Sequence, residues 1–189
     1  MSVKPFKQVF TYRRNDISPW FFTDVVLGVA NEYNTAFVIV ENNGVGKIVA
    51  DTLFNDYDYD NMLSSQVKKG EEQIKGYSMS KVGIHMNKRT KMIGCSALKS
   101  LIEQNAIKLN DWNTIKEFSS FVKSGNSFEA EKGKTDDLVM PFIHFGWLTG
   151  QSFFEDIANS KTLDILKSSN EQISDNTHLA FGFFSDGTV

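Results

Sequence analysis

The sequence predicts an α/β fold in which helices connect the strands of a sheet. Residues 36–40, Ala-Phe-Val-Ile-Val, form a continuous apolar run, which is typical of a strand buried on both faces. A helix is expected before this run, because Ser18 and Pro19 favour a helix start and apolar residues follow at spacings of three and four. Another helix is expected over about 45–54. A strand placed between two helices predicts some parallel pairing.

The remaining elements follow from periodicity, capping and turn residues. Further strands are expected at 7–13, 61–66, 107–109, 121–125, 127–131 and 179–184, where 121–131 is predicted as a hairpin and 179–184 as an edge strand. Further helices are expected at 91–104, at 111–118 after an Asp111 cap, from Asp136 after a Thr135 cap, and once or twice after residue 151. Pro141 falls inside the helix expected from Asp136, where it costs about 3 kcal/mol unless the helix kinks.

The same patterns divide the chain and give a core. Residues 1–150 are expected to form the folded core and 151–189 an acidic C-terminal extension, while the polar residues 67–88 predict a mobile loop. The side chains expected in the core, besides the strand at 36–40, are Phe22, Val25, Val29, Leu98, Leu101 and Phe145.

The composition excludes several classes of protein. The 189 residues, 41% of them hydrophobic, are enough for one globular domain, and a net charge of −3 argues against a globally basic nucleic-acid-binding protein. The single cysteine, Cys95, excludes a disulfide framework and a cysteine-rich zinc site. The longest apolar stretch, 138–148, is far shorter than the roughly 20 residues of a membrane-spanning helix, and no targeting signal is visible. We therefore expect a soluble cytoplasmic protein.

Two motifs look like known binding loops but lack required residues. Residues 44–47, Gly-Val-Gly-Lys, follow a predicted strand as a P-loop would, yet Glu41 and Ile48 stand where that pattern needs glycine and Ser or Thr. Residues 56–60 begin like a calcium loop, but the glycine and glutamate of its sixth and twelfth positions are missing. Cys95 falls on an apolar helix stripe, which favours a core position over a nucleophile.

Acidic residues stand at the ends of two predicted elements. Glu41 comes directly after the strand at 36–40, where open α/β sheets bind ligands, and Asp136 and Asp137 open a predicted helix. Each has a structural alternative, because charges are common at strand ends and acids stabilise helix N-termini. If they converge, the carboxylates could hold divalent cations, and two such ions about 4 Å apart promote phosphodiester hydrolysis.

Four blocks of sequence, taken in order, resemble one known family. They are 37–46 (Phe-Val-Ile-Val-Glu-Asn-Asn-Gly-Val-Gly), 87–103 (opening Asn-Lys-Arg-Thr-Lys), 135–140 (Thr-Asp-Asp-Leu-Val-Met) and 145–148 (Phe-Gly-Trp-Leu). Together they resemble the C-terminal nuclease domain of the large terminase subunit of tailed phages, of the myovirus type, over about residues 7–150. The resemblance implies an RNase H-like (resolvase-like) fold, with a mixed sheet flanked by helices.

The resemblance also implies a metal site. That family holds its ions with three acidic side chains, of which the second corresponds to Glu41 and the third to Asp137, with Asp136 as a neighbour at the metal site. The implied ions are Mg²⁺ or Mn²⁺. The first ligand, an aspartate on the opening strand, has no counterpart, because the chain starts where the family's third strand is expected. We therefore expect a fold whose first strands are missing, and weak or no cleavage by this chain alone.

A local cluster of positive charge fits a DNA partner. Residues 68–91 contain seven basic and two acidic residues, although the whole chain is negative. Phosphate contacts need such charge without base-specific residues. For residues 68–81 a solvated loop is an equal alternative, whereas Lys88, Arg89 and Lys91 lie beside a block that matches the family and are expected to contact double-stranded DNA.

The implied function is therefore metal-dependent hydrolysis of duplex DNA, which cuts concatemeric DNA during phage packaging in the host cytoplasm. The implied partners are a terminase ATPase domain and the portal, with no membrane. The alternatives are a non-catalytic DNA-binding or docking module, or another RNase H-like nuclease such as a junction resolvase. The nuclease hypothesis predicts that the carboxylates of Glu41 and Asp137 lie about 4–8 Å apart, and that their repulsion raises at least one pKa.

Overall fold

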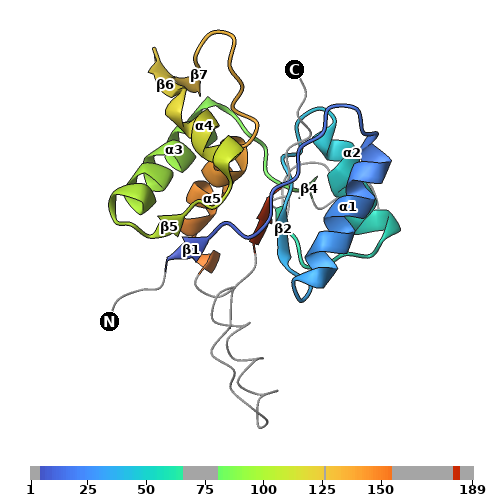
Figure 1. Cartoon of the computed structure of the whole chain (residues 1–189). Helices are drawn as coiled ribbons and strands as arrows, with labels where there is room; N and C mark the ends of the chain where they lie inside the picture. The colour runs from blue at the N-terminus through green and yellow to red at the C-terminus, as the bar shows by residue number, and fades with distance from the viewer. Residues whose placement is uncertain (1–4, 66–80, 126, 155–180, 184–189) are drawn as a thin grey trace.

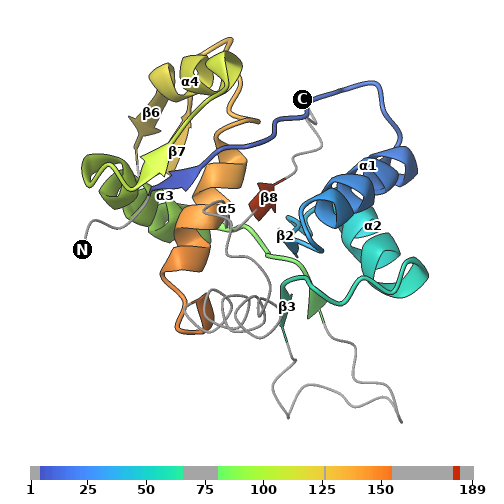
Figure 2. The ribbon, with the colours of Figure 1, turned by 60° about the horizontal axis from the view of Figure 1, so that its bottom comes forward.

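The structure, a computed structural model, describes residues 5–65, 81–125, 127–154 and 181–183. Its elements form two groups that lie side by side (Figure 1). One contains helices α1 (Pro19–Glu32) and α2 (Gly46–Asp51) with strands β2 (Phe37–Ile39), β3 (Ser64–Ser65) and β4 (Lys81–Val82). The other contains helices α3 (Lys88–Glu103), α4 (Trp112–Ser119) and α5 (Met140–Thr149) with strands β1 (Phe6–Lys7), β5 (Ile107–Lys108), β6 (Phe121–Ser124) and β7 (Ser127–Ala130). Strand β8 (Phe181–Phe183) lies between them, as Figure 2 also shows.

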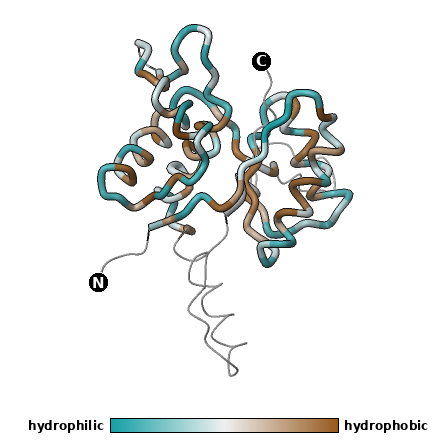
Figure 3. The backbone as a smooth tube through the Cα atoms, in the orientation of Figure 1, coloured by the Kyte–Doolittle hydropathy of each residue, from teal (hydrophilic) through white to brown (hydrophobic). Residues whose placement is uncertain are grey.

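Strand β2 is the centre of the first group, as its apolar run predicts. All of residues 36–40 are buried. Val38 pairs in parallel with Gly182 of β8 on one side and with Met62 on the other, so β2 has a neighbour at both edges. Strands β3 and β4 are antiparallel to each other. Figure 3 shows the hydrophobic residues concentrated at β2 and the segments around it.

The helices next to β2 follow from their sequence signals. Ser18 caps α1 by accepting a hydrogen bond from the backbone N–H of Phe21, and Pro19 occupies the first turn, as predicted. Phe22, Val26 and Ala30 of α1 are buried in one cluster with Val38, Val40 and Leu53. The helix expected over 45–54 is present as α2, which continues into a π-helical turn, η1 (Thr52–Asp56).

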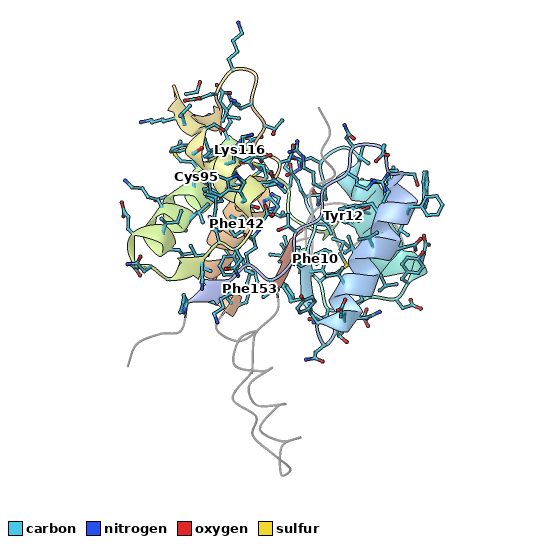
Figure 4. The ribbon with its side chains drawn as sticks, viewed as in Figure 1. Phe10, Tyr12, Cys95, Lys116, Phe142 and Phe153 are labelled. Atoms are coloured by element: carbon cyan, nitrogen blue, oxygen red, sulfur yellow. The ribbon has the colours of Figure 1, made fainter. Side chains whose placement is uncertain are left out.

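Helices α3 and α5 cross closely in the second group, where glycines replace larger side chains. A Cβ on Gly94 would lie 2.4 Å from the carbonyl oxygen of Ile143, and one on Gly146 would lie 2.5 Å from that of Gly94. Cys95 is buried in this crossing (Figure 4), and burial raises the pKa of its thiol to about 11. Cys95 is therefore a core side chain, as the sequence indicates.

Several other predictions are confirmed. Asp111 caps α4 by accepting a hydrogen bond from the N–H of Thr114, β5 forms at 107–108, and β6 and β7 form the expected hairpin. Of the six side chains expected in the core, Phe22, Leu98 and Phe145 are buried, whereas Val25, Val29 and Leu101 are half-buried.

The strand expected over 7–13 is wrong in length. Only Phe6 and Lys7 form β1, which pairs in parallel with β5. The ladder stops because Gln8 is engaged by the next turn: its carbonyl accepts from Asn110 Nδ2 at 2.7 Å, and its side-chain oxygen accepts from the N–H groups of Asn110 and Asp111. The chain then crosses, with Phe10 and Tyr12, from one group of elements to the other (Figure 4).

Two further boundaries differ from the prediction. The loop expected over 67–88 contains β4 and the start of α3, while residues 66–80 lie outside the described part. The helix expected from Asp136 begins instead at Met140, as α5, because the Thr135 hydroxyl donates to Glu117 and does not cap. Pro141 consequently falls in the first turn, where it costs little. The helices expected after 151 fall mainly on residues outside the described part.

Candidate functional site

Glu41 is fixed at the end of β2 by its backbone. It forms a parallel bridge with Ile84, whose N–H donates to Val40 and whose carbonyl accepts from Asn42. The chain then turns sharply into α2, and a Cβ on Gly46 would lie 1.9 Å from the carbonyl oxygen of Glu41. Glycine is needed at position 46 for this close approach, so the glycine-containing motif shapes a strand-to-helix turn that presents Glu41.

The Glu41 carboxylate contacts two side chains that the sequence analysis did not identify. Asn43 Nδ2 donates to Oε1 at 2.9 Å, and His144 Nε2 of α5 lies 3.2 Å from Oε2. The direction of the His144 contact does not satisfy hydrogen-bond geometry, although the distance is short. His144 is only 2% exposed, whereas the Glu41 side chain is 31% exposed. The one signal in the sequence was a lone histidine within the apolar stretch 138–148.

Asp137 lies in the turn that precedes α5 and pairs with an arginine. Its Oδ2 accepts from Arg13 Nη2 at 2.7 Å, and its side chain is 18% exposed. Burial raises the pKa of Asp137, the charges of Glu117 and Asp136 add to this effect, and Arg13 opposes it. A raised pKa was expected, but its main cause is burial and not repulsion from Glu41.

Asp136 and the basic residues meet at the start of α3. Lys91 Nζ lies 3.3 Å from Asp136 Oδ2 and 5.6 Å from the ring centre of Phe121, so Lys91 is engaged within the protein. Lys88 and Arg89 are exposed in the first turn of the same helix, which Asn87 caps. The structure thus places Lys91, one of the three basic residues expected to bind DNA, against Asp136.

Helix α5 lies next to both predicted metal ligands. Asp137 lies in the turn that precedes α5, and His144, seven residues later in α5, contacts Glu41. Within the described ranges, no three side chains of His, Cys, Asp or Glu gather closely enough to hold a metal. The 4–8 Å separation of Glu41 and Asp137, and the metal-binding roles of these residues and Asp136, therefore stay predictions.

A buried glutamate that the sequence analysis did not single out binds residues on either side of Asp137, as well as its partner Arg13. Glu117 of α4 accepts from Arg13 Nη1 at 2.8 Å, from the Thr135 hydroxyl at 2.8 Å and from the N–H of Leu138 at 2.7 Å. Its side chain is 9% exposed. Because Arg13 binds Glu117 and Asp137 together, these contacts fix the turn that carries Asp137.

The raised pKa of Asp137 predicts that Asp137→Asn stabilises the protein at neutral pH. A carboxyl whose folded pKa is raised stabilises the fold when protonated and loses that contribution as the pH rises through the folded pKa. The melting temperature of the variant should therefore exceed that of the wild type by a margin that increases from pH 4 to pH 7, as measured by thermal unfolding.

Asp16 offers a matched control for this measurement. Its pKa is lowered by the hydrogen bond from Arg14, so Asp16→Asn should give no gain at pH 7. A lower melting temperature for Asp137→Asn at pH 7 would show instead that the pairing with Arg13 outweighs the effect of burial.

The comparison with known families agrees with the order of the sequence blocks. Residues 4–167 match the family model described as "Terminase RNaseH-like domain". None of the helices in the described part combines the length and apolar character required to cross a membrane. The match spans most of the chain, including β2 with Glu41, the start of α3 and the turn with Asp137. The chain therefore belongs to the family of terminase RNase H-like domains, a nuclease-type module of phage DNA packaging.

Proposed function

We propose that this chain hydrolyses the phosphodiester bonds of duplex DNA with a divalent metal, and so cuts concatemeric DNA during packaging. The observation that carries the proposal is that Glu41 and Asp137, distant in sequence, both approach the α5 region and both remain partly exposed. In the proposal they act with a terminase ATPase domain and the portal as partners.

Carboxylate ligands suit Mg²⁺ or Mn²⁺, and such ions activate a water molecule and stabilise the leaving oxygen. In the proposed site Glu41 and Asp137 are the ligands, and Asp136 is their neighbour. Lys91 and Arg13 neutralise Asp136 and Asp137 in the structure, so they compensate the acidic charge until an ion binds. The residues present thus fit a cation site in which the protein supplies two carboxylate ligands, Glu41 and Asp137.

Lys88 and Arg89 are proposed to bind the DNA backbone. Both are exposed, and Lys91 links their helix to Asp136, so phosphate contacts at the start of α3 would lie next to the acidic pair. Lys91 contributes positive charge between the exposed pair Lys88 and Arg89 and the acidic residue Asp136.

The chain tested alone is expected to cleave weakly. Two carboxylates provide little negative charge to hold two ions against their mutual repulsion. Misplacing the attacking water by even about 1 Å can lower the rate roughly 100-fold. Cleavage should increase in a longer polypeptide, in which this chain is extended at its N-terminus by a segment that supplies a further aspartate beside Glu41.

The test is nicking of supercoiled plasmid over long incubations in Mg²⁺ or Mn²⁺, by the chain and by the longer polypeptide. We expect nicking that EDTA abolishes and that falls at least about 10-fold in Glu41→Gln and in Asp137→Asn. The matched control is Glu129→Gln, since Glu129 is exposed on β7, away from these contacts. Nicking that persists in Glu41→Gln would contradict the proposed ligands.

Gel shifts on the same proteins separate cleavage from binding. Glu41→Gln should retain its affinity for DNA, while Lys88→Ala with Arg89→Ala should weaken binding and reduce its salt dependence by about one to two counterions. Salt-sensitive binding without any metal-dependent nicking, even by the longer polypeptide, would favour the alternative of a non-catalytic DNA-binding module.

A further inference from the structure

Two buried polar atoms in the described part of the chain have no hydrogen-bond partner, and both belong to side chains that touch Glu41. They are His144 Nε2 and Asn43 Oδ1. His144 is 2% exposed and lies 3.2 Å from Glu41 Oε2. Asn43 uses its amide nitrogen on Glu41 Oε1 at 2.9 Å and on the carbonyl of Met86 at 2.8 Å, which leaves its amide oxygen without a donor.

Their coincidence at one carboxylate indicates a ligand. Buried polar groups are nearly always paired, so an unpaired one requires a specific explanation. Here the imidazole of His144 and the amide of Asn43 each contact the Glu41 carboxylate at the end of β2. His144 Nε2 and Glu41 Oε2 can each donate an electron pair, and a cation between them would satisfy both. The exposed part of the Glu41 side chain leaves a path for the ion to enter.

The spacing of these two atoms suits one ion. Two metal–ligand bonds of about 2.1 Å at a right angle place their ligand atoms about 3.0 Å apart, and a wider bond angle increases that distance. The observed separation of Glu41 Oε2 and His144 Nε2 is 3.2 Å. These two atoms can therefore bind the same ion without a large movement of β2 or α5.

We propose that Glu41 Oε2 and His144 Nε2 chelate one divalent transition-metal ion, with Asn43 Oδ1 as a further ligand, so that the site prefers Mn²⁺ to Mg²⁺. Mg²⁺ binds oxygen ligands and retains several waters, whereas Mn²⁺, which also suits oxygen ligands, belongs to the first-row transition metals that bind at sites of mixed nitrogen and oxygen ligands. This inference rests on the proposed function, because it uses the Glu41 end of the same site, and it selects the ion and adds His144 to the ligands. Asp137 remains available to a second ion or to the substrate.

The test is pulsed EPR of the protein loaded with Mn²⁺ alone. A directly bound imidazole gives a nitrogen coupling to the manganese, which a histidine that merely positions Glu41 does not give. The chain contains three histidines, so the double variant His85→Gln, His178→Gln leaves His144 as the only source of that coupling. We expect the coupling to persist in this double variant, whose result does not depend on altering the buried His144.

Affinity measurements complete the test. His144→Gln should weaken Mn²⁺ binding by about 10-fold or more and Mg²⁺ binding by much less, while exposed His85→Gln should change neither. Bound Mn²⁺ that shows no nitrogen coupling, in a protein where Glu41→Gln abolishes binding, would overturn this inference and leave the proposed nuclease function standing. Absence of binding of both Mn²⁺ and Mg²⁺, even in the longer polypeptide, would overturn both.

Discussion

Replacing Gly146 by alanine is expected to lower the free energy of unfolding by about 2–3 kcal/mol, a typical cost of overpacking. The added Cβ would lie 2.5 Å from the carbonyl oxygen of Gly94, 2.9 Å from the backbone nitrogen of Leu98 and 3.1 Å from its Cβ. Two of these atoms are backbone, so no rotamer change can relieve the contact and α3 and α5 must separate. Chemical denaturation followed by circular dichroism measures the loss.

Gly28 provides the matched control, because it also lies within a helix but a Cβ added there would have no atom within 4 Å. Gly28→Ala should stabilise the protein by about 0.5–1 kcal/mol through helix propensity. Gly94→Ala should resemble Gly146→Ala, and the double variant should cost less than the sum, since one separation of the helices accommodates both methyl groups. Equal stability of Gly146→Ala and the wild type would contradict the close crossing.

The effect of Gly146→Ala should extend to the candidate site. His144 is two residues away on the same helix and contacts Glu41 at 3.2 Å. If α5 moves away from α3, His144 moves relative to β2, and the geometry that we propose for the ion is lost. A loss of Mn²⁺ affinity in Gly146→Ala, but not in Gly28→Ala, would connect the helix crossing to the site.

Features that depend on a few neighbouring residues could be predicted from the sequence. The Ser18 and Asp111 caps, the buried strand at 36–40 and the hairpin at 121–131 all form as expected. In each case the local signal and the packing agree. The end of a buried strand likewise pointed to Glu41 as a candidate site residue before any contact was known.

Features that depend on distant partners could not be predicted in this way. The alternation at 7–13 favours a strand, but Gln8 bonds to the turn at 110–111 and the ladder ends there. A strand at 179–184 was expected, yet nothing in its sequence indicated that it would pair with β2. The contacts of His144 with Glu41 and of Arg13 with Asp137 arise in the same way, since they require whole elements to pack first.

Glu117→Ala is expected to destabilise the protein by about 2–4 kcal/mol, because one buried carboxylate connects three segments. Its loss would leave the buried N–H of Leu138 without its acceptor and would remove one partner of Arg13 and of Thr135. The expected loss is below that of a fully buried ion pair, since Arg13 is 41% exposed. The control is Glu103→Ala, which removes only an exposed pair with Lys99 and should cost about 0.5 kcal/mol or less.

A second measurement distinguishes loss of local support from general unfolding. Glu117→Gln keeps the size of the side chain and should be less destabilised than Glu117→Ala, so its folded state can be titrated. The charge of Glu117 helps to raise the pKa of Asp137, and Arg13 opposes that rise. Removing the charge of Glu117 takes away one of the influences that raise the pKa of Asp137 and leaves the opposing effect of Arg13 in place. The pKa of Asp137 should therefore fall toward its ordinary value, as carboxyl NMR can measure. An unchanged pKa in Glu117→Gln would show that Glu117 stabilises the turn without affecting the charge of Asp137.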